Sequence, residues 1–387
     1  MTDIGLALRD KVAIAGVGLK VGSFPGRTPA SLATDAFRMA LDDAGMKRED
    51  VDGIFSLSYG ADYDRFLEAA GLDVRYAFQG WSHGRFISPM IQQAALVVGS
   101  GMAKCIALVH GRRKKGYGST ADGEMWRQGL GPHGESPAYG AMGPVFGAAI
   151  ACNRYFDMYG GKDGDLAPIA MAFRKHAQMN PNAMRRNPMT YDDYMKSRWI
   201  IEPLRLFDCC QNNEGGACIL ITSAERAKDC RKKPVYVSGM QGVHAGRQFH
   251  NLCLPGLGVA QQEIYKYKPQ KEDLYAYHMA GVTQKDIDLV MTYDAFTPLV
   301  LFMLERFGFC GPGEALEFIK NGRIEVGGEL PINTSGGLHS EGHVTGYNLF
   351  IEAIRQLRGE CGERQVKDAK VAQYACFLGE SVIMRSE

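Results

Sequence analysis

The residues with the clearest capacity for chemistry lie in one stretch, residues 333–348. It combines closely spaced glycines with His339, Glu341 and His343. Glycines at this density allow the backbone to turn tightly and to approach a ligand. Histidine titrates near neutral pH and can therefore move a proton during a reaction. The pattern fits a proton-transfer site, and from spacing alone it fits a glycine-rich connecting loop equally well.

A second candidate is the turn at residues 80–90. It follows a short strand expected at 74–78 and precedes an apolar helix expected at 90–100. Enzymes of the α/β class place nucleophiles at such turns, at the N-terminus of the helix. This turn contains no cysteine, and Ser82 and Ser88 lack the G-x-S-x-G surroundings of an activated serine. The pattern therefore favours a structural turn over a nucleophile.

A third candidate is the basic run at residues 112–115, which begins with Arg112 and Arg113. A run of this kind is usually a solvated face. Its alternative role is to bind the phosphates of an acidic ligand such as coenzyme A.

The composition excludes several classes of protein. Lys and Arg total 44 against 43 Asp and Glu, a net charge of +1 over 387 residues, which argues against a general nucleic-acid binder. No secretory signal and no apolar stretch of membrane-spanning length is evident, so a cytoplasmic location without a membrane span is expected. The cysteines form no C-x2-C pair, which predicts reduced, mostly buried thiols and no metal site.

The elements that must position these residues follow a β-α-β order. Residues 11–18 are typical of a buried strand ending in a G-x-G turn, without the third glycine of a dinucleotide-binding fingerprint. An amphipathic helix at 29–44, closed by Gly45, and a strand at 51–58 follow. Later helices are expected at 149–159 and 165–178, and Thr190 is expected to cap another.

The chain also contains an internal repeat. The sequence DDAGMKREDVDGIFS at residues 42–56 is echoed by HMAGVTQKDIDLVMT at 278–292. The repeat predicts two halves of one α/β fold, at 1–230 and 231–387. The first half would carry an inserted loop and helical region at about 111–200, which we expect to form a substrate lid or a dimer surface.

The repeat and the glycine-rich stretch together resemble the thiolase fold, a duplicated five-layer α/β/α/β/α architecture. Other stretches resemble the lipid-transfer-protein branch of that superfamily, also called the sterol-carrier-protein type. They are most similar to its steroid side-chain aldolases. The stretches that carry this resemblance are residues 173–181, 197–210, 293–298, 307–314 and 330–337.

The resemblance implies an unusual chemistry. Thiolases carry an acyl-accepting cysteine in the first-half turn, and the corresponding place in this chain is near Gly84, with no cysteine close by. Glycine cannot replace a thiolate nucleophile. The branch without this cysteine cleaves a β-hydroxyacyl-CoA by a retro-aldol reaction, which needs a base and a group that stabilises the enolate. We therefore expect a carbon–carbon lyase that acts on a bulky, steroid-like acyl chain and releases a ketone or aldehyde and a short acyl-CoA.

The catalytic residues implied by the resemblance are Tyr293, His343 and Tyr347. Tyr293 replaces the asparagine of a thiolase motif, and a phenol, with an ordinary pKa of about 10, must be polarised to act as a base. His343 matches the histidine of the thiolase Gly-His motif. The steroid aldolases carry a second tyrosine around this point, and in this chain Tyr347 follows four residues later. The expected substrate- or CoA-binding residues are His83, Gly84, Arg112, Arg113, Asp294, Gly336, Gly337 and Gly342.

The other polar or reactive residues of these motifs are expected to have structural roles. His339 and Glu341 are expected at a solvated loop edge. Cys376 lies near the place of the second thiolase cysteine, but no glycine-rich loop follows it, so a buried thiol is expected. Tyr293 itself has an alternative role as a packed tyrosine at the end of a strand.

The resemblance also implies partners. A homodimer is expected, joined to a small partner of the OB-fold, DUF35 type in a heterotetramer. The chain itself would need no cofactor, and any zinc would belong to the partner subunit. Two alternatives stay open: an acyltransferase that finds its nucleophile elsewhere, and a non-catalytic subunit that binds acyl-CoA or lipid.

Overall fold

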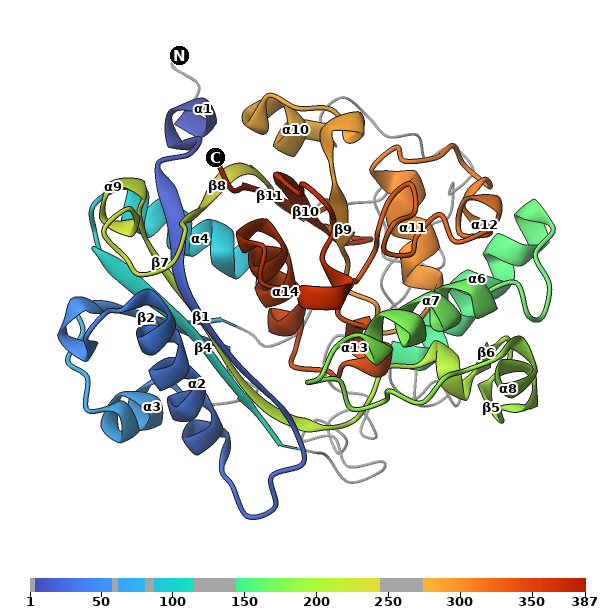
Figure 1. Cartoon of the computed structure of the whole chain (residues 1–387), viewed down its shortest axis with the longest axis horizontal. Coiled ribbons are helices and arrows are strands. Elements are labelled where there is room, and N and C mark those ends of the chain that lie inside the picture. Colours follow the sequence, from blue (N-terminus) through green and yellow to red (C-terminus); the bar gives the residue numbers. More distant parts are fainter. Residues whose placement is uncertain (1–3, 58–61, 81–86, 114–143, 244–273) are drawn as a thin grey trace, which may run out of the picture.

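The computed structural model describes residues 4–57, 62–80, 87–113, 144–243 and 274–387 (Figure 1). Within these residues a nine-stranded sheet has the order β3-β2-β4-β7-β1-β8-β11-β10-β9. The first-half strands are β1 (Val12–Gly22), β2 (Gly53–Leu57), β3 (Tyr76–Gly80), β4 (Cys105–Arg112) and β7 (Glu214–Ser223). The second-half strands are β8 (Val235–Gln241), β9 (Leu289–Met291), β10 (Val371–Ala375) and β11 (Ser381–Arg385).

The two halves of the sheet repeat one pattern. From the centre outward, β1-β7-β4-β2 and β8-β11-β10-β9 each show two antiparallel pairings followed by a parallel one. The halves meet where β1 pairs with β8 over two residues, Ala13 with Tyr236 and Ile14 with Val235. This is the duplication that the internal repeat predicts. The boundary predicted near residue 230 falls in the link before β8.

The repeated sequence performs the same local task in each half. Gly45 and Gly281 both end a helix in the left-handed conformation, at φ 70° and 66°. Asp52 accepts hydrogen bonds from the backbone N–H groups of Lys104 and Cys105 at the start of β4. Asp288 accepts the equivalent bonds from Lys370 and Val371 at the start of β10. The shared Gly-x4-Asp-x-Asp pattern thus closes a helix and then anchors a neighbouring strand.

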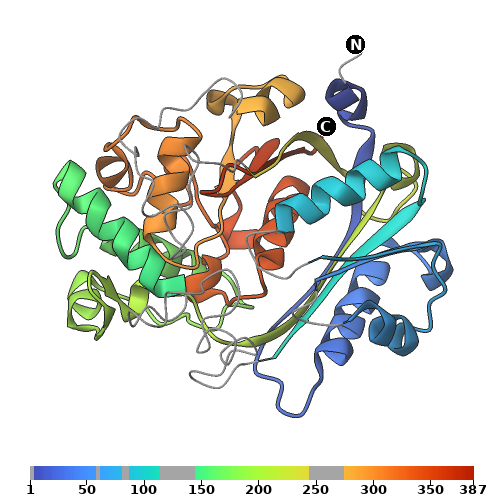
Figure 2. The same cartoon turned by 180° about the vertical axis from the view of Figure 1, so that it is seen from behind.

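The helices arrange these half-sheets into layers. Helices α2 (Pro29–Ala44) and α3 (Tyr63–Ala70) cover the outer face of the first half-sheet, and α10 (Tyr275–Ala280) covers that of the second (Figures 1 and 2). Helices α4 (Ile87–Gly99) and α14 (Tyr347–Arg358) lie between them and contact strands of both. The order of layers is α/β/α/β/α, as expected for a thiolase fold.

The glycines of the first strand serve helix packing. A Cβ on Gly18 would lie 1.9 Å from the carbonyl oxygen of Ala36, and one on Gly16 would lie 2.3 Å from that of Ala40. The G-x-G sequence therefore allows α2 to pack directly on β1. Thr28 starts α2 by accepting a hydrogen bond from the Ser31 N–H.

The main hydrophobic core surrounds the two central helices. Phe350 of α14 stacks on Tyr374 of β10, with ring centroids 4.1 Å apart, and Ile91 of α4 is fully buried. A separate cluster lies under α2 and α3, where Phe37 and Phe66 meet edge to face. Burying each such side chain contributes about 1.5–3 kcal/mol.

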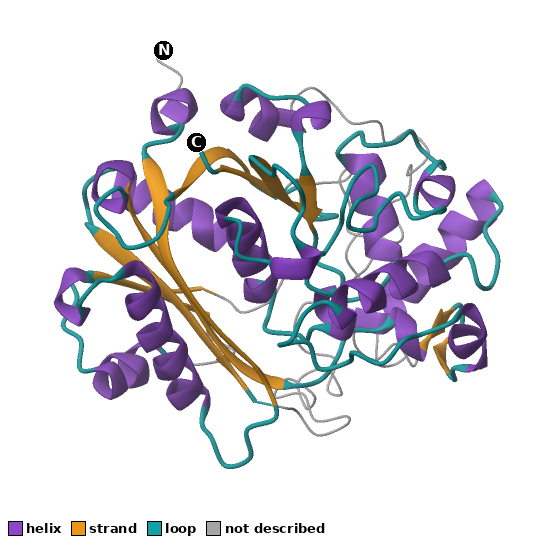
Figure 3. Ribbon diagram, in the orientation of Figure 1, coloured by secondary structure: helices purple, strands orange, loops and turns teal. Residues whose placement is uncertain are grey.

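The remaining elements gather at one end of the molecule (Figure 3). Helix α13 packs against α7, α8 also contacts α7, and α11 contacts both α6 and α12. Their bounds are α6 (Pro144–Tyr159), α7 (Ala167–Gln178), α8 (Tyr191–Lys196), β5 (Trp199–Ile201), β6 (Leu204–Arg205), α11 (Pro298–Arg306), α12 (Ala315–Phe318) and α13 (Gly337–Ser340). Two short helices lie elsewhere, α1 (Ile4–Leu8) and α9 (Ala224–Ala227).

The predicted local elements are found with small shifts. Thr190 caps α8 as expected, by accepting a hydrogen bond from the Asp193 N–H. The strand expected at 74–78 lies at Tyr76–Gly80, and the helix expected at 90–100 ends at Gly99, because Gly101 adopts φ 76° in the turn that follows. Among the described residues no helix has the length and apolarity needed to cross a bilayer.

Candidate active site

Three segments far apart in the chain converge at the C-terminal end of β9. They are residues 208–214, 292–297 and 333–348. Backbone and side-chain bonds join them: Cys210 N–H donates to Ala295 O at 2.9 Å, Gln211 N–H donates to Leu338 O at 3.0 Å, and Thr292 N–H donates to Asn333 Oδ1 at 2.8 Å. The glycine-rich stretch is therefore fixed beside the loop that carries Tyr293.

The structure brings Tyr293 and His343 into direct contact. The Tyr293 hydroxyl lies 3.2 Å from His343 Nε2, and the ring centroids are 5.8 Å apart. On the other side of the imidazole, Cys210 Sγ lies 3.4 Å from Nδ1. Tyr293 is 4% exposed, and His343 and Cys210 are half-buried. A phenol, an imidazole and a thiol thus form one chain of polar contacts.

The backbone at His343 is held on both sides. Its N–H donates to Asn213 Oδ1 at 2.6 Å. The preceding Gly342 has φ 146°, and a Cβ there would lie 2.3 Å from Val21 Cγ1. Gly342 therefore serves the close approach of the loop to β1, which presents the imidazole to Tyr293.

Cys210 is the site residue that sequence reasoning missed. Its only signal was the adjacent pair Cys209-Cys210, which has no metal-ligand spacing. Burial raises the pKa of the Cys210 thiol to about 11, against the lowering effect of the positive charges of Arg112 and Arg185. The thiol is therefore protonated at neutral pH, unlike the thiolate of a nucleophilic cysteine.

Asp294 holds the glycine-rich loop in place by hydrogen bonds to its backbone. It is fully buried, and both carboxylate oxygens accept from Leu338 N–H at 3.0 Å. Gly337, at φ 61°, leaves room for it, since a Cβ there would lie 2.2 Å from Asp294 Oδ2. Gly336 is packed equally closely, because a Cβ at this position would lie 2.7 Å from Ala177 Cβ. These contacts of Asp294, Gly336 and Gly337 hold the loop, and their contact with substrate stays a prediction.

The pH dependence of stability gives a test of this role. Burial raises the pKa of Asp294 to about 7, opposed by its hydrogen bond from Leu338. The folded state thus binds the proton more tightly than the unfolded chain. The contribution of protonated Asp294 to the free energy of unfolding is complete below pH 4 and is lost as pH rises to about 7. The free energy of unfolding then falls by at most about 1.4 kcal/mol per pH unit. Asp294→Asn should remove this slope, as measured by urea unfolding from pH 4 to 8.

The exposed Asp64 of α3 provides the control for that measurement. Asp64→Asn removes a surface carboxyl group and shows the effect of the same substitution away from the site. If the Asp294→Asn curve runs parallel to the wild-type curve from pH 4 to 7, the carboxyl group of Asp294 does not titrate as stated.

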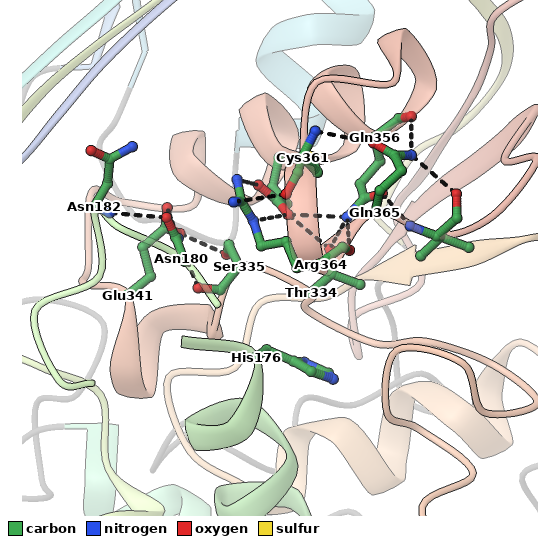
Figure 4. Close-up of polar contacts among 12 residues, drawn as sticks. His176, Asn180, Asn182, Thr334, Ser335, Glu341, Gln356, Cys361, Arg364 and Gln365 are labelled. Carbon is green, nitrogen blue, oxygen red and sulfur yellow. Dashed lines mark hydrogen bonds and ion pairs between the residues drawn. The ribbon is translucent and has the colours of Figure 1, made fainter. Parts of the chain in front are cut away.

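The two weaker candidates in the stretch lie in the interior, so the expected solvated edge is wrong. Glu341 accepts hydrogen bonds from Ser335 Oγ at 2.7 Å and from Asn180 Nδ2 at 3.3 Å (Figure 4). Burial raises the pKa of Glu341 to about 7. His339 is 3% exposed against Phe173, and burial lowers its pKa to about 3. The cause is α13, which turns both residues toward α7.

His176 is a further support that the sequence did not reveal. Its Nδ1 lies 3.2 Å from Asn333 O, and its Nε2 accepts from Val326 N–H at 3.0 Å. These partners require a neutral ring with its proton on Nδ1. Burial lowers the pKa of His176 to about 4, consistent with that neutral form. Figure 4 shows His176 below the turn that holds Thr334 and Ser335.

Tyr347 is not placed with Tyr293 and His343. It is fully buried at the start of α14, stacks on His110 and donates its hydroxyl proton to Val109 O at 3.4 Å. Burial raises its pKa above the ordinary phenol range. The prediction that Tyr347 is catalytic is corrected to a role in joining α14 to β4, because the left-handed turn at Thr345 and Gly346 redirects the chain.

The candidate CoA-binding residues fall in two groups. His83 and Gly84 lie outside the described residues. Arg112 is the last residue of β4, and its Nε is buried without a hydrogen-bond partner in the described part of the chain. Arg113 follows it and is exposed. Both arginines stay predictions as CoA ligands.

The other cysteines of the described segments are buried or partly buried. Cys376 is fully buried, as expected. The cysteines of the described segments form no disulfide, and no group of His, Cys, Asp and Glu in these segments could hold a metal ion.

Comparison with known proteins gives consistent matches. A family model described as "Thiolase C-terminal domain-like" matches residues 271–381. The chain is 34% identical to a "Steroid side-chain-cleaving aldolase" of Thermomonospora curvata, over 90% of each chain. It is 33% identical to the "17-hydroxy-3-oxo-4-pregnene-20-carboxyl-CoA lyase" of Mycobacterium tuberculosis, over 91% of this chain and 92% of that one.

Solved structures show the same relationship. A structure titled "Ltp2-ChsH2(DUF35) aldolase" superimposes with a TM-score of 0.83 at 30% identity, covering 98% of both chains. Human mitochondrial 3-ketoacyl-CoA thiolase in complex with CoA superimposes with a TM-score of 0.65 at 14% identity, covering 98% of both chains. This second likeness concerns the fold alone.

Proposed function

Because this chain belongs to the thiolase-like family of the sterol-carrier-protein type, in the branch of the steroid side-chain-cleaving aldolases, we propose that it is a carbon–carbon lyase. It cleaves a β-hydroxyacyl-CoA into a ketone or aldehyde and a short acyl-CoA. The names of its relatives favour a substrate whose acyl chain carries a steroid or a similarly bulky group.

One observation carries the proposal for the site. The Tyr293 hydroxyl contacts His343 Nε2 at 3.2 Å, while the first-half turn at residues 80–90 contains no cysteine. A phenol and an imidazole in contact can transfer a proton, but they cannot replace a thiolate as acyl acceptor. The pair therefore suits retro-aldol cleavage, which requires no acyl-enzyme.

The proposed reaction follows from this geometry. The Tyr293 oxygen takes the proton of the β-hydroxyl group while its own proton passes to His343 Nε2. The C–O bond of the substrate becomes a carbonyl, the Cα–Cβ bond breaks, and its electron pair stays on the acyl-CoA as a thioester enolate. The proton then returns through Tyr293 to Cα, so that the pair ends in its starting state. The imidazolium that forms on His343 in between stabilises the negative charge of the enolate.

The partner and assembly are part of the proposal. The solved relative is named as a complex with a DUF35 protein, which supports a partner of that type for this chain. We infer further that two copies of this chain form a dimer and that two partner subunits complete a heterotetramer. The chain would use no cofactor of its own.

The test is a cleavage assay on the reconstituted complex. The chain is co-expressed with a DUF35-type partner and incubated with β-hydroxyacyl-CoA thioesters of increasing bulk at Cβ. Carbonyl product and shortened acyl-CoA should appear in equal amounts, and turnover should increase with bulk. Consumption of 3-ketoacyl-CoA with no cleavage of any β-hydroxyacyl-CoA would contradict the proposal.

A second candidate function rests on Cys210. A cysteine within hydrogen-bond reach of a histidine is also the arrangement of a covalent catalyst, and Cys210 Sγ lies 3.4 Å from His343 Nδ1. Under this alternative the protein would be an acyltransferase with a displaced nucleophile. The raised pKa of Cys210 opposes it. Mass spectrometry after incubation with acyl-CoA distinguishes the two, since only the acyltransferase forms an adduct.

Arg113 is proposed to contact the phosphates of CoA, together with Arg112. Arg113→Gln should raise KM for the acyl-CoA by about tenfold with kcat little changed, because the lost attraction acts equally on the bound substrate and the transition state. The salt dependence of KM should also weaken. Arg38→Gln, on the exposed face of α2, is the matched control and should change neither quantity. An unchanged KM in Arg113→Gln would contradict the assignment.

A further inference from the structure

We propose that Cys210 is a positioning residue that selects the tautomer of His343. Its sulfur accepts a hydrogen bond from Nδ1–H, which leaves Nε2 unprotonated and facing the Tyr293 hydroxyl. This inference rests on the proposed lyase function and names the group that makes the Tyr293–His343 pair competent as a base.

The geometry fixes Cys210 relative to both catalytic residues. Its Sγ lies 3.4 Å from Nδ1, a distance suited to an N–H···S contact, and the opposite ring nitrogen lies 3.2 Å from the phenol oxygen. The Cys210 N–H donates to Ala295 O, two residues after Tyr293. Cys210 is thus attached to the Tyr293 loop through its backbone and to His343 through its side chain.

The choice of tautomer decides which way protons can move. A neutral imidazole has one N–H donor and one acceptor nitrogen. With the proton on Nδ1, Nε2 accepts the phenol proton, and the Tyr293 oxygen can take the proton of the substrate hydroxyl. With the proton on Nε2, the imidazole donates to the phenol oxygen. Nε2 then cannot accept the proton of the Tyr293 hydroxyl. Only the first tautomer supports the proton transfer that cleavage needs.

The charges around Cys210 agree with an acceptor role. Arg112 and Arg185 favour electron density on the sulfur, whereas the nearby carboxyl of Asp294 opposes it. Burial nevertheless keeps the thiol protonated, with a pKa of about 11. A neutral sulfur that accepts from an imidazole N–H can orient the ring without becoming a nucleophile.

Kinetics of Cys210 variants form the first test. Cys210→Ala should lower kcat by about tenfold with KM unchanged, and Cys210→Ser, which keeps an acceptor, should restore most of the loss. Combining Cys210→Ala with His343→Ala should cost no more than His343→Ala alone, because Cys210 acts only through that ring. The matched control is Cys209→Ala: Cys209 directs its thiol toward Arg205 O at 3.7 Å, and its loss should leave kcat unchanged.

A spectroscopic measurement tests the inference independently of activity. Long-range ¹H–¹⁵N correlation spectra of the full chain labelled in histidine report which ring nitrogen carries the proton, with His343 assigned from the His343→Gln spectrum. The wild type should show the proton on Nδ1, and Cys210→Ala should shift the population toward Nε2 while Cys210→Ser should not. A proton on Nε2 in the wild type, or an unchanged tautomer in Cys210→Ala, would overturn the inference.

The two tests also separate this inference from the proposed function. If no β-hydroxyacyl-CoA is cleaved but the tautomer responds to Cys210 as stated, the function is wrong and the positioning role stands. If cleavage is found and the tautomer is independent of Cys210, the function stands and the positioning role is wrong. An acyl adduct on Cys210 would exclude the positioning role directly.

Discussion

Replacing Tyr293 by phenylalanine is expected to lower kcat for β-hydroxyacyl-CoA cleavage by about 10²–10⁴-fold, with KM changed by less than about threefold. The ring and its packing are retained, and only the hydroxyl that contacts His343 Nε2 is lost. The proton of the substrate hydroxyl then has no acceptor. Steady-state kinetics of the reconstituted complex give kcat and KM separately.

A second buried tyrosine provides the control for this variant. Tyr277 of α10 donates its hydroxyl proton to Gln373 Oε1 at 2.8 Å, away from the site. Tyr277→Phe removes an equivalent buried hydroxyl and should leave kcat unchanged. If Tyr293→Phe retains activity within a few-fold of the wild type while folded, Tyr293 is a packing residue and the proposed proton path is wrong.

Removing Arg364 is expected to produce the largest loss of stability, about 3–5 kcal/mol for Arg364→Ala. Arg364 makes two hydrogen bonds to Glu352, from Nε at 2.8 Å and from Nη2 at 3.0 Å, and both side chains are buried. Without the guanidinium the Glu352 carboxylate is left buried and uncompensated. Urea unfolding at neutral pH measures the change.

This ion pair also supports the site. Thr334 donates to Glu352 Oε1 at 3.0 Å, and Gln356 donates to Thr334 Oγ1 at 3.0 Å. Figure 4 shows Arg364 and Gln356 close to Thr334, at the start of the glycine-rich stretch. Arg364→Ala should therefore also lower kcat, through displacement of the stretch that carries His343.

Two further variants test whether the loss of stability comes from an uncompensated charge in the buried Arg364–Glu352 pair. The double variant Glu352→Gln with Arg364→Met should recover part of the stability, because it leaves no uncompensated charge. Lys320→Ala breaks an exposed pair with Glu317 and should leave the urea midpoint unchanged. A loss below about 1 kcal/mol for Arg364→Ala would show that the carboxylate is solvated, contrary to its burial in the structure.

Local sequence signals predicted the elements well. Thr28 and Thr190 begin helices and Gly45 ends one, since capping depends on residues within a single turn. The internal repeat was readable because Gly45, Asp50 and Asp52 have counterparts with identical spacing in the second half. The same local rules could not reveal that Gly16 and Gly18 serve packing against α2, because that tertiary contact joins β1 to the helix lying on its face.

The site was predictable only in part, for a physical reason. Tyr293 and His343 were recognised by their resemblance to known motifs, but nothing in composition brings Cys210 to a histidine 133 positions away. His339 and Glu341 appeared exposed because glycine-rich polar stretches usually are. Their burial depends on α13 packing against α7, a tertiary contact without a local signal. Tyr347 was misplaced because only three residues separate it from His343 in the sequence, and the turn at Gly346 directs its side chain elsewhere.

The most direct test asks whether cleavage needs free CoA. Purified complex is mixed with a β-hydroxyacyl-CoA in the absence of free CoA, products are quantified over a single turnover, and the intact mass of this chain is recorded at each time point. Retro-aldol cleavage predicts carbonyl product and acyl-CoA in equal amounts at full rate, with the mass of the chain unchanged throughout. Product formation that requires added CoA, or an acyl adduct that appears and decays with turnover, would contradict a lyase that works through Tyr293 and His343.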